Sequence, residues 1–217
     1  GDTWEVIRSD MGQAFAIKRS STAVMLYADS DNRLYKSLDR GDTWVELPAW
    51  RSQVNKIARD VFIDASSADG YLTIYACTSS GVYKSVNDGA SWATANAGLP
   101  STDTRDFNAG MKVSSVVMYV AVYGHGVYKS TDGAVSWLAA NTGLNVGAAG
   151  RMELGLCESD PDTVYAGSQE NGGPTVYKTT DGGAHWSMVL TNPAAGNFPA
   201  GVIVERDWMT LAYGWAW

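Results

Sequence analysis

The sequence predicts an all-β fold made of repeated four-stranded units, and three observations support this prediction. A motif that ends in tryptophan recurs at 33–44 (RLYKSLDRGDTW), 81–92 (GVYKSVNDGASW), 126–137 (GVYKSTDGAVSW) and 175–186 (TVYKTTDGGAHW). Alternating apolar runs of strand length accompany each copy, whereas helical periodicity is sustained nowhere. The composition, with 23 Gly, 9 Trp and 11 Tyr among 217 residues, favours short strands joined by tight turns.

The spacing of the repeats narrows the prediction within the all-β class. The chain opens on GDTW, which matches the end of a fifth copy, so the closing tryptophans are Trp4, Trp44, Trp92, Trp137 and Trp186. Their mean separation is about 45 residues, which with several short strands per unit is typical of a propeller blade. We therefore expect a β-propeller built of four-stranded antiparallel blades.

Each unit contains four expected strands in a fixed order. The first is an apolar stretch, seen as QAFAIKR, DVFIDA, MKVSSV, ELGLCE and GVIVE. The second alternates, as in AVMLYADS, LTIYACTS, VMYVAVYG and TVYAGS. The third is the x-V-Y-K-S segment that opens the motif, and the fourth begins at the motif's tryptophan. Between them, Ser and Asp side chains favour a tight turn and Gly permits positive φ.

The repeat boundaries predict an incomplete propeller. We expect four blades at 8–47, 48–96, 97–141 and 142–190, with partial blades at 1–7 and 201–217. An open propeller would expose strand edges and an apolar blade face, which natural proteins avoid. The expected partner is therefore the rest of the propeller, supplied by further polypeptide or by another chain.

Composition excludes several classes of function. The formal net charge of −7 argues against nucleic-acid binding, and no apolar run approaches the roughly 20 residues that a membrane helix needs. Cys77 and Cys157 lie 80 positions apart and are expected to be buried free thiols. Without a CxxC or Cys/His cluster, we expect neither a metal site nor a cofactor.

The motif S-x-D-x-G-x-[ST]-W resembles the Asp-box, also called the bacterial neuraminidase repeat. Asp-boxes recur in sialidases, xyloglucan-active endoglucanases, sortilin-type receptors and photosystem assembly factors. The resemblance implies a structural hairpin on the outer side of each blade and an extracellular or periplasmic location. It assigns structural roles to Asp39, Trp44, Asn87, Trp92, Asp132, Trp137, Asp181 and Trp186. The third copy has Gly133 one position early and Ala134 in the usual Gly place, so we expect a slightly different turn there.

A second periodic feature lies where each first strand begins. An arginine is followed after one or two positions by a carboxylate at Arg8–Asp10, Arg59–Asp60, Arg105–Asp106, Arg151–Glu153 and Arg206–Asp207. One interpretation is a ring of structural ion pairs between blades. The other is a polar floor that grips an anionic or polyhydroxylated ligand, with Trp208 beside it. In both, we expect the arginine to lower the pKa of its carboxylate, which disfavours a general-acid role.

The resemblance implies two classes of function. The first is a polysaccharide-binding or polysaccharide-processing propeller related to the xyloglucanase-like glycoside hydrolases, a group also suggested by NAGLP (96–100) and NTGL (141–144). The alternative is a non-catalytic scaffold for protein interaction or assembly. Sialidase chemistry is disfavoured because the chain lacks an FRIP-like segment, and no catalytic residue is assigned. Trp50 is a candidate sugar platform or a cover for a blade edge.

Overall fold

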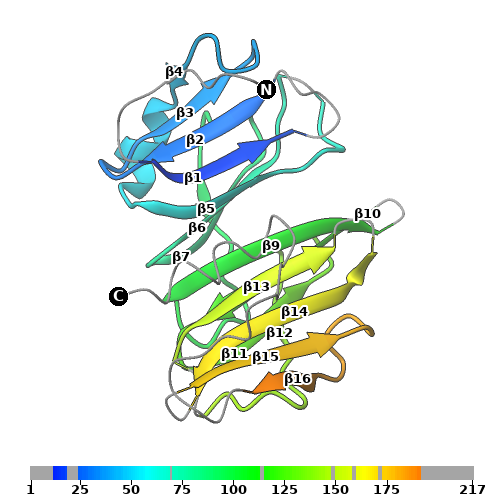
Figure 1. The fold of residues 1–217 in the computed structure, drawn as a ribbon. Coiled ribbons are helices and arrows are strands. Elements are labelled where there is room, and N and C mark those ends of the chain that lie inside the picture. Colours follow the sequence, from blue (N-terminus) through cyan, green and yellow to red (C-terminus); the bar gives the residue numbers. More distant parts are fainter. Residues whose placement is uncertain are drawn as a thin grey trace, which may run out of the picture. The chain divides into compact units, whose positions relative to one another are not determined.

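The computed structural model describes residues 12–18, 24–68, 70–112, 115–147, 150–157, 160–170 and 173–191. The expected partial blades at 1–7 and 201–217 lie outside this part, as do Arg8, Asp10, Arg206, Asp207 and Trp208. The described residues form four four-stranded antiparallel sheets, which confirms the all-β prediction (Figure 1). They fall into two compact units. The first ends at Ala95 and the second begins at Asn96.

The first unit contains two sheets. The first sheet comprises β1 (Gly12–Ile17), β2 (Met25–Asp29), β3 (Leu34–Ser37) and β4 (Val45–Glu46). The second comprises β5 (Ala58–Ile63), β6 (Ile74–Thr78), β7 (Gly81–Ser85) and β8 (Ala93–Thr94), with the short helical turn η1 (Trp50–Val54) between the two sheets. The core between them contains Leu26, Leu34, Trp50, Ile63 and Ile74.

The second unit repeats this plan. The third sheet comprises β9 (Thr104–Lys112), β10 (Ser115–Val122), β11 (Gly126–Ser130) and β12 (Leu138–Ala139). The fourth comprises β13 (Met152–Cys157), β14 (Asp160–Glu170), β15 (Gly173–Thr179) and β16 (Ser187–Thr191). Val117, Tyr119, Leu154, Val164 and Trp186 belong to their shared core.

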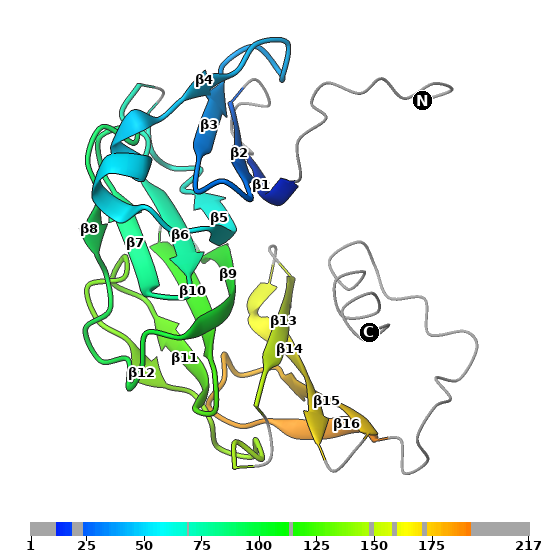
Figure 2. The same ribbon diagram turned by 90° about the vertical axis from the view of Figure 1, so that its left-hand side faces the viewer.

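Each sheet is a meander in which neighbours in sequence are neighbours in space. Within each unit the first strands of the two sheets lie together, β1 with β5 and β9 with β13 (Figure 2). Because the strands are antiparallel, the start of each first strand lies at the same sheet end as the turn between the second and third strands. In the third sheet, for example, Val122 pairs with both Thr104 and Gly126. The motif turns between the third and fourth strands lie at the opposite end.

The four motif turns, at 37–44, 85–92, 130–137 and 179–186, share one hydrogen-bond network and are called the repeat turns here. In the first, the Ser37 hydroxyl lies 2.8 Å from Asp39 Oδ1 and accepts the Gly41 N–H at 2.8 Å. Asp39 also accepts the Thr43 N–H at 2.9 Å and the Thr43 hydroxyl at 2.6 Å. The side chains therefore satisfy backbone groups that a tight turn leaves without a partner.

The third repeat turn keeps most hydrogen bonds of the others and differs slightly, as expected, because the Val135 N–H donates to Asp132 Oδ1 at 3.0 Å whereas the equivalent Asp42 N–H donates to the Asp39 carbonyl at 3.4 Å. The Ala134 N–H donates to the Ser130 hydroxyl at 3.0 Å, just as the Gly41 N–H donates to Ser37. Ala134 adopts a φ of 62° to do so. The Asp132 carboxylate accepts four hydrogen bonds, which stabilise the turn and offset the cost of an alanine at positive φ.

The NAGL and NTGL segments hold each following repeat turn in the second unit. Ala97 accepts the Trp137 N–H at 2.9 Å, and Thr142 accepts the Trp186 N–H at 2.8 Å. Gly98 and Gly143 have φ values of 91° and 95°, and a Cβ on either would lie 2.2 Å from the carbonyl oxygen of that tryptophan. Glycine is therefore required at both positions.

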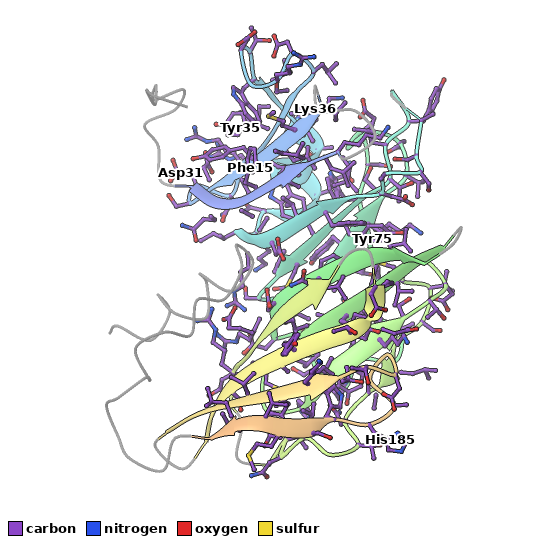
Figure 3. All side chains as sticks on the ribbon, turned by 45° about the vertical axis from the view of Figure 1, so that its right-hand side comes forward. Phe15, Asp31, Tyr35, Lys36, Tyr75 and His185 are labelled. Atoms are coloured by element: carbon purple, nitrogen blue, oxygen red, sulfur yellow. The ribbon has the colours of Figure 1, made fainter. Side chains whose placement is uncertain are left out.

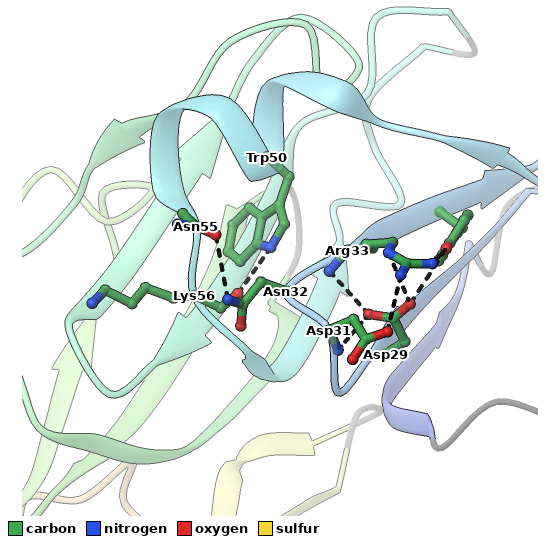
Figure 4. Close-up of polar contacts among 8 residues, drawn as sticks. Asp29, Asp31, Asn32, Arg33, Trp50, Asn55 and Lys56 are labelled. Carbon is green, nitrogen blue, oxygen red and sulfur yellow. Dashed lines mark hydrogen bonds and ion pairs between the residues drawn. The ribbon is translucent and has the colours of Figure 1, made fainter.

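In the first unit η1 replaces this segment. Trp92 donates its N–H to Gln53 Oε1 at 2.9 Å, and the Trp50 and Trp92 rings meet edge to face at 4.8 Å. Trp50 is fully buried, and its Nε1 donates to the Lys56 carbonyl at 3.0 Å (Figure 4). Trp50 is therefore a packing residue between two sheets and cannot be a sugar platform.

Candidate functional site

The second unit brings several of the predicted polar residues together where β9 and β13 begin. Arg105 and Asp106 lie on β9, Glu153 lies on β13, and Arg151 immediately precedes β13. The two strands are neighbours within this unit. These residues, with Asp103 and Tyr123, are called the inner-strand cluster here.

Arg105 pairs with Asp103 rather than with Asp106, the carboxylate that follows it. Its Nη2 donates to Asp103 Oδ2 at 2.6 Å, and its guanidinium carbon lies 4.5 Å from the centre of the Tyr123 ring. The register of β9 shifts at this point, because Thr104 pairs with Val122 and Asp106 pairs with Ala121, which leaves Arg105 as the extra residue of a bulge. The ion pair that Arg105 forms therefore lies within one blade and not between blades.

Arg151 does pair with Glu153, the carboxylate that follows it in the sequence. These residues are two positions apart, and Arg151 Nη2 contacts Glu153 Oε1. The Glu153 side chain is 9 % exposed and that of Arg151 is 54 % exposed. The arginine therefore covers a buried carboxylate while it remains partly in solvent.

Asp106 binds the neighbouring strand rather than an arginine. Its Oδ2 accepts the Leu154 N–H at 2.5 Å, and Asn108, two positions further along β9, donates from Nδ2 to the Leu154 carbonyl at 2.9 Å. Two side chains of β9 thus satisfy both the backbone N–H and the backbone carbonyl of Leu154. These side-chain contacts join β9 to β13, where backbone hydrogen bonds would join two strands of one sheet.

Burial raises the pKa of both carboxylates and outweighs the lowering effect of a nearby arginine that the sequence predicts, which Arg151 does exert on both. Burial, with a smaller contribution from the Glu153 charge, raises the pKa of Asp106 to about 7. The N–H donors of Leu154 and Phe107 oppose this rise only in part. Burial also raises the pKa of Glu153, against the opposing effect of Arg151. Two nearby buried carboxyl groups resist simultaneous ionisation.

Tyr123 is the aromatic residue of the cluster, and its side chain is 47 % exposed. It follows β10, and its N–H donates to the Asp103 carbonyl at 2.9 Å. A Cβ on Gly150 would lie 3.2 Å from the Tyr123 hydroxyl, so glycine gives the ring room. Tyr123, Asp103 and Asn108 were not among the predicted site residues. Asp103 lies two positions before Arg105 in the sequence, whereas Tyr123 follows another strand, β10.

In the first unit, Arg59 is the extra residue of a bulge in β5, because Ala58 pairs with Thr78 and Asp60 pairs with Cys77. Asp60 Oδ1 accepts the adjacent Val61 N–H at 2.8 Å. The joint ligand site that would combine these residues with Arg105 and Arg151 stays a prediction.

A second polar cluster lies at the turn between β2 and β3 (Figure 4). Asp29 Oδ1 accepts the N–H groups of Asp31 and Arg33 at 2.9 and 3.0 Å. Arg33 also donates to Asp31 Oδ2 at 2.9 Å, and the Tyr35 hydroxyl donates to Asp29 Oδ2 at 3.3 Å. The buried Asp29 carboxylate is thus matched by donors of its own turn, which makes this cluster structural.

Other chemistry receives no support from the described residues. They contain no group of three His, Cys, Asp or Glu side chains arranged to hold a metal ion. Cys77 is a buried free thiol, as expected. His185 lies 2.9 Å from Asp181 Oδ2 within the fourth repeat turn, where it takes the place of the usual Ser or Thr (Figure 3). None of the described helices is long and apolar enough to span a membrane.

Comparison with solved structures identifies the class of fold. A GH74 xyloglucanase from Xanthomonas campestris superposes with a TM-score of 0.63 at 19 % identity over 81 % of this chain. A GH74 enzyme from Niastella koreensis gives 0.62 at 19 % identity, also over 81 %. YCF48 from Cyanidioschyzon merolae gives 0.58 at 12 % identity over 85 %. At these identities the likeness concerns the fold alone.

The chain therefore forms part of a β-propeller, and each four-stranded sheet is one blade. It spans 29 % of the length of each of the two GH74 enzymes and 57 % of YCF48. No protein-family model matches the chain, and no curated protein matches it.

Proposed function

We propose that the chain is part of a secreted Asp-box β-propeller that binds a polysaccharide at the inner-strand cluster. The observation that carries this proposal is the exposed Tyr123 ring, held beside the Arg105–Asp103 ion pair. An aromatic face beside planar charged groups suits a sugar, which offers C–H groups to the ring and hydroxyl groups to the ions. The fold shared with GH74 xyloglucanases is consistent with this ligand class.

The cluster supports binding better than cleavage. Glycoside hydrolysis needs two carboxyl groups on either side of the bond that breaks. A raised pKa would suit Asp106 as a proton donor, but Asp106 is engaged by the Leu154 N–H. Glu153 is buried and paired with Arg151. We therefore assign binding to this chain and leave any catalytic acid pair to other parts of the protein.

Affinity electrophoresis of the intact protein through gels containing xyloglucan and other soluble polysaccharides tests this proposal. We expect at least one polysaccharide to retard the protein, and Tyr123→Ala to weaken retardation about tenfold or more. Tyr71→Ala is the matched control, because Tyr71 is 74 % exposed but lies in the loop between β5 and β6. Equal retardation of both variants would overturn the assignment of Tyr123.

The second candidate function is a non-catalytic scaffold for protein interaction or assembly. It is favoured because Arg105 and Arg151 are both engaged by carboxylates of their own unit, as a purely structural ion-pair system requires. On this alternative, Arg105→Ala and Arg151→Ala lower the melting temperature without affecting any polysaccharide complex. Absence of retardation on every polysaccharide would reject the binding proposal and leave the scaffold.

A further inference from the structure

Two carboxyl groups lie in the contact between β9 and β13 within the second unit. Asp106 of β9 accepts the Leu154 N–H at 2.5 Å, and Glu153 is the residue before Leu154 on β13. Among the described residues, Arg151 is the cation whose charge acts on the pKa of both carboxyl groups. Charged groups taken out of water need partners of opposite charge, so one arginine cannot neutralise two carboxylates. The charge balance of this contact therefore requires a proton on one of them.

The surroundings of Asp106 favour this residue as the one that holds the proton. Its carboxyl group accepts backbone N–H groups, including that of Phe107, whereas the ion pair of Arg151 is with Glu153. In the described part of the chain, the charges that act on the pKa of Asp106 are those of Glu153 and Arg151. None comes from β10 or β14, which also pack against β9. Burial and the Glu153 charge raise this pKa to about 7, which agrees with a proton held at Asp106.

Arg151 connects the buried carboxyl groups to the surface that carries Tyr123. Its Nη2 contacts Glu153 Oε1, whereas 54 % of its side chain is exposed. A guanidinium has five N–H donors, so this contact leaves others for a ligand. The residue before it, Gly150, accepts the Gly124 N–H at 2.8 Å. This hydrogen bond holds the backbone at Arg151 beside the turn that carries Tyr123.

We propose that a proton on Asp106 regulates ligand binding at the inner-strand cluster, because it determines whether Arg151 binds the ligand or is drawn to the buried carboxylates. This inference rests on the polysaccharide-binding function proposed above. With Asp106 neutral, Arg151 balances Glu153 alone, and its remaining donors bind hydroxyl groups of a sugar that stacks on Tyr123. With Asp106 ionised, two carboxylates attract the guanidinium inward, and its donors are lost to the ligand.

The direction of the pH dependence follows from which state binds the ligand. The pKa of Asp106 lies above its ordinary value of 3.8, so the binding state is populated below about pH 7 and is lost as the pH rises through this value. Because the ligand and the proton favour the same state, a bound polysaccharide should in turn raise the pKa of Asp106. A neutral polysaccharide has no group that titrates in this range, so the pH dependence belongs to the protein.

Isothermal titration calorimetry of the intact protein with a neutral polysaccharide that retards it in the gels tests this inference at pH 6 and pH 8. We expect the affinity of the parent protein to be lower at pH 8 by about threefold or more. Asp106→Asn should remove this pH dependence, because an amide oxygen still accepts the Leu154 N–H and cannot ionise. Asp42→Asn is the matched control and should keep the dependence, since Asp42 is an exposed carboxylate of the first repeat turn.

A measurement without ligand separates this inference from the proposed function. Carbon-detected nuclear magnetic resonance follows the guanidinium carbon of Arg151, assigned with Arg151→Lys, as the pH is raised from 6 to 8. We expect this signal to shift with a midpoint near pH 7 in the parent protein and to stay constant in Asp106→Asn.

The two measurements together distinguish the possible failures. Equal polysaccharide affinity of the parent protein at both pH values, or an Arg151 signal that does not shift, would overturn the regulation and leave the binding function in place. A shift of the Arg151 signal in a protein that no polysaccharide retards would reject the binding function, and with it the regulation of binding.

Discussion

At the scale of single residues, glycine positions decide how closely one blade holds the next. Gly98 and Gly143 combine positive φ with a backbone contact that leaves no room for a methyl group. Gly124 also has positive φ, 71°, but no atom lies within 4 Å of the place of its Cβ. The sequence contains both kinds of glycine, and only the structure distinguishes them.

Gly143→Ala should therefore destabilise the protein far more than Gly124→Ala. We expect a loss of more than about 2 kcal/mol at Gly143, from left-handed strain plus overlap with the Trp186 carbonyl. Gly124→Ala should cost only about 1 kcal/mol, from strain alone. Urea unfolding of both variants measures the difference. Similar losses would mean that the NTGL segment does not clamp the next repeat turn.

At the scale of elements, the repeat turn is stabilised by an ionised carboxylate. Hydrogen bonds from Ser136, through its hydroxyl and N–H, lower the pKa of Asp132 to about 2. Similar bonds from Thr43 lower the pKa of Asp39. The second turn has Asn87 instead, which accepts the Ser91 N–H at 2.9 Å and donates to the Ser91 hydroxyl at 2.8 Å. The second repeat turn therefore makes similar hydrogen bonds without a charge, and it serves as a reference for the three turns with aspartate.

Asp132→Asn should make the third turn insensitive to acid. Because the folded pKa lies below the ordinary value of 3.8, the ionised group adds stability above about pH 4 and loses it as the pH falls toward 2. We expect the variant to be less stable by about 1 kcal/mol or less at pH 7. Its deficit should vanish near pH 2, as measured by thermal unfolding across this range. A deficit that is constant with pH would contradict the role of the charge.

The Asp106–Glu153 pair predicts the opposite pH dependence for the contact between β9 and β13. The pKa of Asp106 is raised above 3.8 to about 7, so the folded state holds a proton that the unfolded chain releases. The resulting stability is present at about pH 4 and is lost as the pH rises through 7.

Asp106→Asn should remove this loss, because an amide oxygen still accepts the Leu154 N–H and carries no charge. We expect the melting temperature of the variant to exceed that of the parent at pH 8 and to approach it near pH 5. Asp132→Asn serves as the contrasting control, since its deficit in stability should be the same at pH 5 and at pH 8. A parent protein with equal stability at pH 5 and pH 8 would argue against a shared proton at this pair.

At the scale of the whole molecule, the sequence predicted the architecture well and the candidate site poorly. The period of about 45 residues and the strand order within each repeat correspond to the four described sheets. The sequence did not predict that Arg105 pairs with Asp103 or that burial raises the pKa of Asp106, and it left two roles open for Trp50, of which burial excludes the sugar platform. Arg206, Asp207 and Trp208 lie outside the described residues, so their role in a ligand site stays a prediction.

The sequence by itself determined the repeat, its four strands and the side chains that close each turn, because those interactions join residues within a few positions of one another. The tertiary structure decided the partners of each charged residue, because partners on different strands depend on register and on which face a side chain takes. Leu154 receives Asp106 and Asn108 from a strand 46 to 48 positions away.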